Sequence, residues 1–125
     1  MDENEIAYRI IGAGIEVHKH LGPGLLESAY HECLKKELNL QGVLFESEVP
    51  ISVSYKNEVV DIAYRVDLLV ENKVIIELKA VPGVDALHKA QLLTYLRLFD
   101  KKLGLLMNFN EIVLKQGICR VVNNL

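Results

Sequence analysis

The chain has 125 residues, enough for one domain with a hydrophobic core, and we expect residues 1–125 to form that single domain. Half of the residues are hydrophobic and a quarter are charged, which excludes a disordered or low-complexity chain. No apolar run approaches the roughly 20 residues of a membrane span. The net charge of −3 also lacks the positive excess typical of nucleic-acid-binding proteins, so a phosphate-bearing substrate would need a local patch or a bound cation.

The first third of the sequence predicts two helices separated by a glycine-rich break. Residues 3–20 carry apolar side chains at helical spacing. Gly22-Pro23-Gly24 ends this helix, because glycine past the last turn and proline beyond it stop helices. A second helix is predicted for residues 25–41. Glu27 lies in its first turn, where a carboxylate gains from the helix dipole even without any function.

Residues 43–79 change to the composition and two-residue period of β-strands. Pro50 interrupts the first run and favours an edge strand or a bend. Lys56-Asn57-Glu58 suits a hairpin turn. The last two strands are largely apolar on both faces, which is typical of central strands covered by helices. The predicted strands span residues 43–49, 51–55, 59–70 and 73–79.

The remaining residues predict one more helix and a buried strand. Pro82-Gly83 breaks the chain, and Asp85 is a good N-cap for a helix that reaches about Asp100. Residues 103–108 read as a buried parallel strand, and residues 112–122 as a further strand or hairpin. The order of elements predicts a mixed α/β domain, in which helices cover a central mixed sheet.

Three of the charged residues in the apolar hairpin of residues 64–79 form a candidate cluster: Asp67, Glu77 and Lys79. Glu77 and Lys79 are two apart on one strand and therefore emerge on the same face. Asp67 faces Glu77 if the loop between the strands has three residues, and faces Ile76 if it has two. The sequence around the turn leaves both registers open. Ionised groups are costly to bury unless they are paired or bind a metal, so this cluster suggests a functional site.

Asp67 and Glu77 offer the oxygen ligands that Mg²⁺ or Mn²⁺ prefers, and Lys79 would lie beside a metal-bound water. This arrangement suits phosphodiester hydrolysis, in which the lysine orients the nucleophile or stabilises charge on a phosphoryl oxygen. An ordinary ion pair at a sheet edge would produce the same spacing. The spacing therefore supports a metal site without distinguishing it from a structural ion pair.

A wider set of residues resembles a known family. Gly24, Glu27 and Tyr30 match the signature of the GxxExxY protein family, which is itself similar to the PD-(D/E)XK nuclease superfamily. Asp67, then Glu77-Leu78-Lys79, then Gln91 to Tyr95 follow in the order seen in its exonuclease-type branch. The similarity spans about residues 5–123. Val66 stands where the superfamily is named for a proline.

The resemblance implies a restriction-endonuclease-like core of αβββαβ order, with a metal between the second and third core strands. It assigns metal ligation to Asp67, Glu77 and Glu27, and the catalytic lysine to Lys79. Gln91 and Tyr95 would position the substrate or the lysine. The resemblance also predicts the register that the turn leaves open, with Asp67 opposite Glu77.

These observations lead to two functional hypotheses. The first is a metal-dependent nuclease that uses Mg²⁺ or Mn²⁺ to hydrolyse phosphodiester bonds in DNA or RNA, with DNA expected ahead of RNA. The second is a catalytically inactive module of the same fold that binds nucleic acid or protein, as the acidic balance suggests. A small acidic core also leaves room for a homo-oligomer, in which a second subunit helps to hold the substrate.

The cysteines and the N-terminal residues indicate the cellular compartment in which we expect the protein. Cys33 and Cys119 lie far apart, without the spacing of a metal site or redox motif. We expect them to be reduced thiols, as in a cytosolic protein. The first residues are acidic where a signal peptide would be positive, so we expect a cytoplasmic protein with no membrane partner.

Overall fold

A computed structural model describes residues 1–125, with the side chain of Ala63 left aside. Three α-helices, five β-strands and one turn of 3₁₀ helix make up the described chain. The helices are α1 (Glu3–Leu21), α2 (Glu27–Leu40) and α3 (Ala86–Phe99), and the 3₁₀ turn is η1 (Leu114–Gly117). The strands are β1 (Phe45–Tyr55), β2 (Glu58–Val70), β3 (Val74–Lys79), β4 (Leu103–Asn108) and β5 (Ile118–Val122).

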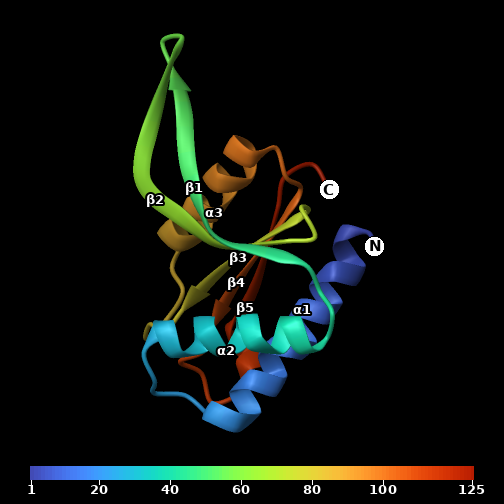
Figure 1. Ribbon diagram of the computed structural model, residues 1–125. Coiled ribbons are helices and arrows are strands. Elements are labelled where there is room, and N and C mark those ends of the chain that lie inside the picture. Colours follow the sequence, from blue (N-terminus) through green and yellow to red (C-terminus); the bar gives the residue numbers. More distant parts are fainter.

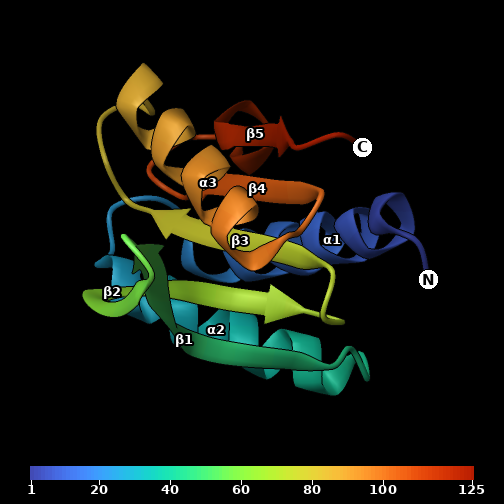
Figure 2. The same ribbon diagram turned by 90° about the horizontal axis from the view of Figure 1, so that it is seen from above.

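The strands form one mixed sheet in the order β1-β2-β3-β4-β5. β3 and β4 run parallel and are connected through α3, whereas the other neighbouring strands are antiparallel. Helices α1 and α2 cover one face of the sheet and α3 covers the other (Figures 1 and 2). The predicted mixed α/β architecture, with a central sheet flanked by helices, is confirmed.

Two hydrophobic cores lie on the two faces of the sheet. The larger one packs α1 and α2 against the sheet, and Ile10, Tyr30 and Leu78 within it are fully buried. The smaller one lies under α3 and contains Ile75, Leu92 and Leu106. β3 and β4 contribute side chains to both cores, which explains why their sequences are continuously apolar. Near the end of β3, Glu77 is therefore buried and Lys79 is half-buried.

The β1–β2 hairpin is longer than the rest of the sheet, and its distal half projects beyond the domain body (Figure 1). Strand β1 is an edge strand, and its register with β2 shifts between Pro50 and Ile51. The prediction of an edge strand or bend at Pro50 is confirmed. The prediction of two strands, residues 43–49 and 51–55, is wrong. Proline lacks only an N–H, so on an edge it interrupts the pairing without ending the strand.

Of the two alternatives predicted for residues 112–122, the further strand is confirmed as β5 (Ile118–Val122) and the hairpin is wrong. Residues 112–122 do not form a hairpin around Gln116-Gly117, because these two residues belong to the 3₁₀ turn that precedes β5. Gly117 lies so close to the backbone oxygen of Asn108 that an added Cβ would collide with it. Glycine is therefore required here for close packing. The remaining helix and strand boundaries agree with the sequence prediction to within about two residues.

Candidate active site

The β2–β3 hairpin fixes the position of the two central carboxylates. Val70 pairs with Val74, and Leu68 pairs with Ile76, so the loop has three residues, 71–73. Glu71 and Asn72 both adopt positive φ, at 52° and 56°, and the Lys73 amide donates to the carbonyl oxygen of Val70 at 3.0 Å. In this register Asp67 falls opposite Glu77. The register that the family resemblance predicts is confirmed.

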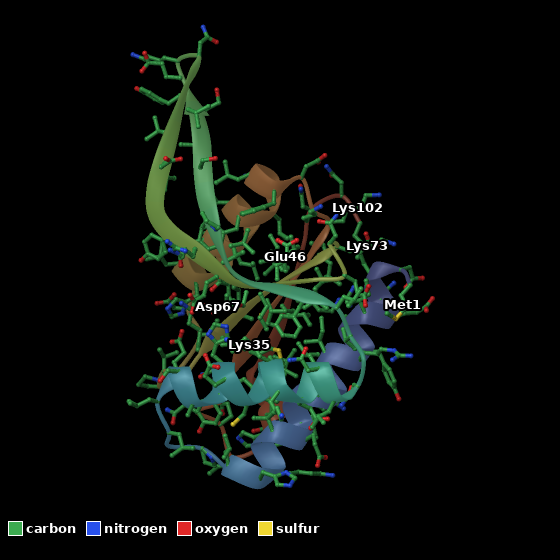
Figure 3. The ribbon with its side chains drawn as sticks, viewed as in Figure 1. Met1, Lys35, Glu46, Asp67, Lys73 and Lys102 are labelled. Atoms are coloured by element: carbon green, nitrogen blue, oxygen red, sulfur yellow. The ribbon has the colours of Figure 1, made fainter. Side chains whose placement is uncertain are left out.

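Asp67 lies where β2 separates from β3. Regular pairing ends at Leu68 and Ile76. The next β3 amide that points toward β2, that of Leu78, therefore has no backbone partner on β2. The Leu78 amide donates instead to Asp67 Oδ2 at 2.8 Å. The carboxylate thus replaces a strand hydrogen bond and is held against β3, because a buried amide without a partner would be costly. Asp67 lies on the side of the molecule opposite Met1, near the start of α2 (Figure 3).

Glu77 is the most perturbed acid of the cluster. Only 8% of the residue is exposed, and its Oε1 is buried without a hydrogen-bond partner. Burial raises the pKa of Glu77 to about 9; the charge of Asp67 and a hydrogen bond with Asp67 add to the effect, and the charge of Lys79 opposes it. At neutral pH Glu77 therefore retains its proton. Two adjacent carboxyl groups, of which Glu77 is buried, form the centre of the site.

Glu27 reaches the cluster from the first turn of α2. Glu27 is exposed at the protein surface, yet partial desolvation of its carboxyl group, followed by the negative charge of Asp67, raises its pKa, whereas Lys79 and His31 lower it. The loop before α2 is fixed by Tyr30, which is fully buried. Its hydroxyl donates to the Gly22 carbonyl at 2.6 Å and accepts from the Leu25 amide at 3.1 Å. Tyr30 therefore positions the start of α2, and with it the carboxylate of Glu27.

The glycines of this loop serve its backbone conformation. Gly22 and Gly24 have φ values of 66° and 98°, and a Cβ at either position would meet no atom within 4 Å. Space is available for a side chain, so the requirement is for a left-handed backbone that glycine adopts freely. The GxxExxY pattern is thus explained physically: glycine allows the turn, tyrosine fixes it, and glutamate is presented at its end.

Lys79 is half-buried at the end of β3, beside Asn108 of β4 in the parallel register. The Phe109 amide donates to the Lys79 carbonyl at 2.9 Å. The Asn108 side chain is buried and closes the next loop: its Oδ1 accepts from the Val81 amide at 3.1 Å, and its Nδ2 donates to the Val81 carbonyl at 3.0 Å. These bonds fix the backbone on both sides of the lysine.

Helix α3 adds a tyrosine to the other side of the cluster. Tyr95 is 7% exposed, and burial raises its pKa to about 12, with smaller contributions from the charges of Glu77, Tyr64 and Asp67. The phenol therefore keeps its proton and is able to donate a hydrogen bond. Gln91 lies half-buried one turn earlier on α3. Within the part of the chain that the structure describes, it makes no hydrogen bond to the cluster.

The structure thus brings together Glu27, Asp67, Glu77, Lys79 and Tyr95, with Gln91 at the edge. Sequence reasoning missed the loop closure by Asn108 and the proximity of Tyr64 to Tyr95. The signal for Asn108 was present, since it is a polar residue that ends a continuously apolar strand. Tyr64 gave no signal, because its place depends on the register shift in the β1–β2 hairpin.

The residues can be tested against the chemistry of a divalent cation. Among the described side chains, no group of three or more His, Cys, Asp or Glu residues is arranged to hold a metal ion. Mg²⁺ usually keeps several waters, however, and needs only one or two carboxylates. Asp67 and Glu77 supply that pair, and the buried oxygen of Glu77 has no other partner. The donor set therefore fits a hydrated Mg²⁺ or Mn²⁺.

The order of elements is that of a restriction-endonuclease-like fold, and the acid cluster lies at the end of its strand β3. The profile of the PD-(D/E)XK nuclease superfamily matches residues 4–121, and the chain belongs to this superfamily. Its members are generally nucleases that use Mg²⁺ or Mn²⁺.

Comparison with solved structures gives a second similarity. The crystal structure of SSO0001 is 25% identical to the chain, with a TM-score of 0.55. The match covers 78% of this chain and 50% of SSO0001, so the chain corresponds to about half of that protein. No protein of curated function matches the sequence. No helix among the described residues is long and apolar enough to cross a membrane.

Proposed function

We propose that this chain is a metal-dependent nuclease of the GxxExxY type, which hydrolyses phosphodiester bonds in nucleic acid, with DNA expected ahead of RNA as the substrate. The observation that carries the proposal is the buried carboxyl group of Glu77, which lies beside a second acid, Asp67, and near Lys79. A structural ion pair would need one acid and one base. A second buried acid is costly to the fold, as expected of a group retained for function.

Asp67 and Glu77 would hold the cation, and Glu27 would complete or orient its ligand shell. A bound Mg²⁺ or Mn²⁺ supplies a Lewis acid for the phosphoryl oxygen and lowers the pKa of a coordinated water. The Lys79 ammonium orients the nucleophile or stabilises charge that develops on the phosphoryl group. Tyr95 donates a hydrogen bond, since its raised pKa keeps the phenol protonated. Gln91 positions the substrate from the same helix.

The same proposal covers the organisation and location of the protein. Residues 1–125 act as one nuclease domain, because a single sheet carries both cores and the site. Cys33 and Cys119 are both free thiols, in keeping with a reducing cytoplasm.

Incubation of the purified protein with single- and double-stranded DNA and with RNA, with Mg²⁺ or Mn²⁺, tests the activity. We expect cleavage that disappears on chelation and in the Glu77→Ala and Lys79→Ala variants. Glu46→Gln is a matched control, because Glu46 is an exposed acid of β1 with no role in the site. Cleavage that survives both alanine substitutions comes from a contaminant and refutes the proposal.

Calorimetry separates catalysis from the alternative of an inactive binding module, which the net charge of −3 favours. A nuclease should bind Mg²⁺ or Mn²⁺, and Asp67→Asn should abolish that binding while its amide oxygen still accepts from Leu78. A chain that binds DNA or protein but no cation is the inactive module.

A further inference from the structure

Helix α1 presents a second surface that the nuclease site does not use. One side of the helix is buried in the larger core, through residues such as Ile6 and Ile10. On the outer side of α1 a groove of about 1000 Å³ runs past Ile11, Gly12 and Ile15 to Glu37 of α2, and its floor includes Ile11 and Ile15, which are half-buried against the same core. The groove belongs to neither the acid cluster nor the loops around it.

The same patch carries both a projection and a hollow. Tyr8 is 81% exposed, which is unusual for a tyrosine on a packed helix. Gly12, one turn later, leaves a gap, since an added Cβ there would meet no atom within 4 Å. An interface with two-fold symmetry uses one patch twice, so the patch must be complementary to itself. A projecting ring beside a hollow on one helix face meets this requirement.

The charges on α1 are also complementary to themselves. In an antiparallel pair of α1 helices that cross at Gly12, residues whose numbers sum to 24 or 25 face each other. Glu5 then faces Lys19 of the second copy, and Arg9 faces Glu16 of the second copy. The symmetry repeats both pairs, so four oppositely charged contacts surround the crossing point. Like charges face each other at none of these positions.

Within one copy these charges are largely unused. Arg9 and Glu16 are seven residues apart, about 10 Å along the helix, too far for a direct ion pair. Across the described residues Arg9 forms no ion pair, and Glu16 has only His20, at 3.5 Å and only when the histidine is protonated. The groove therefore carries free charges in an order that a second copy can satisfy.

We propose that this face of α1 is a docking surface for a second copy of the chain, with the two α1 helices antiparallel and crossing at Gly12. Tyr8 of each copy enters the groove of the other, and Arg9 pairs with Glu16 across the two-fold axis. The N-terminal end of α1 lies across the molecule from Asp67 (Figure 3). The acid clusters thus face away from this end in each copy.

Sedimentation over a range of concentrations tests the proposal. The wild-type chain should reach twice its monomer mass of 14.1 kDa. Arg9→Glu and Glu16→Arg should each weaken the dimer by about tenfold or more, because like charges then face across the axis. An equimolar mixture of these two variants should dimerise again, since every facing pair in the heterodimer has opposite charges. The double variant R9E/E16R should also dimerise.

Lys36→Glu is the matched control, because Lys36 is an exposed charge on α2 outside the groove. It should leave the dimer unchanged. A wild-type chain that stays monomeric overturns the proposal, and so does a dimer that Arg9→Glu leaves intact. If a charge variant fails to fold by circular dichroism, Tyr8→Ser takes its place and should also give a monomer. None of these outcomes depends on nuclease activity.

Discussion

Glu77 and Asp85 are two carboxyl groups that the fold treats in opposite ways. Asp85 is exposed and caps α3: its Oδ1 accepts from the His88 amide at 2.9 Å, and this bond lowers its pKa. Glu77 is buried beside a second acid, and burial raises its pKa to about 9. The charge on Asp85 stabilises the folded chain, whereas the charge on Glu77 destabilises it. An acid that costs stability is the better candidate for function.

The largest difference between the two acids should appear in activity. We expect Glu77→Gln to lower nuclease activity by about 100-fold or more, because a carboxylate that holds the cation contributes several kcal/mol to charge stabilisation. Asp85→Ala should leave activity within about twofold of wild type, since the cap lies outside the acid cluster. The measurement is the rate of DNA cleavage by the Glu77→Gln and Asp85→Ala variants at saturating Mg²⁺. Equal losses in both variants would show that the cluster has no special role.

The comparison also explains what the sequence could predict. Helix ends were predictable because their signals are local, such as the cap at Asp85 and the glycine-proline break at Gly22-Pro23-Gly24. Confinement of Glu77 and Lys79 to one face follows from the two-residue period of a strand. These features need no knowledge of distant contacts, and the structure agrees with them.

Other features depend on contacts that a local pattern does not contain. The spacing left the Asp67 register open, because the loop at residues 71–73 lacks the Asn-Gly signal and uses positive φ at Glu71 and Asn72. The continuity of β1 through Pro50 depends on its edge position in the sheet. The raised pKa of Glu77 depends on α3 and the sheet together excluding water.

The second difference should appear in the pH dependence of stability. In the metal-free folded chain the pKa of Glu77 is about 9, above its ordinary value of 4.5. Between these values the folded state binds more protons than the unfolded state, so stability falls as pH rises, by at most about 1.4 kcal/mol per pH unit. Glu77→Gln removes this dependence. Urea unfolding of both proteins from about pH 5 to about pH 9 tests this. As pH rises, the free energy of unfolding of wild type should fall relative to that of Glu77→Gln.

A bound cation should stabilise the charged form of Glu77, which destabilises the metal-free fold. Metal binding requires the carboxylate to lose its proton, so affinity for Mg²⁺ or Mn²⁺ should rise as pH approaches 9, by up to about tenfold per pH unit. The melting temperature should therefore increase more on addition of Mn²⁺ at about pH 8 than at about pH 6. Glu77→Gln should show little increase at either pH. The same increase in wild type at both pH values would show that Glu77 is not a ligand.

The smallest effect concerns Asp85. Asp85→Ala removes the acceptor for the His88 amide and should lower the melting temperature by a few degrees, whereas Asp85→Asn keeps an oxygen acceptor and should lower it less. Because folding lowers the pKa of Asp85 from 3.8, its charge contributes stability above that value and loses this contribution as pH falls through the folded pKa. The difference in melting temperature between wild type and Asp85→Asn should therefore vanish in acid. At that pH Glu77 is uncharged and does not destabilise the folded chain. Calorimetric melting between about pH 2 and about pH 7 measures it; a difference that persists at the lowest pH would mean that the charge of Asp85 is not what stabilises the cap.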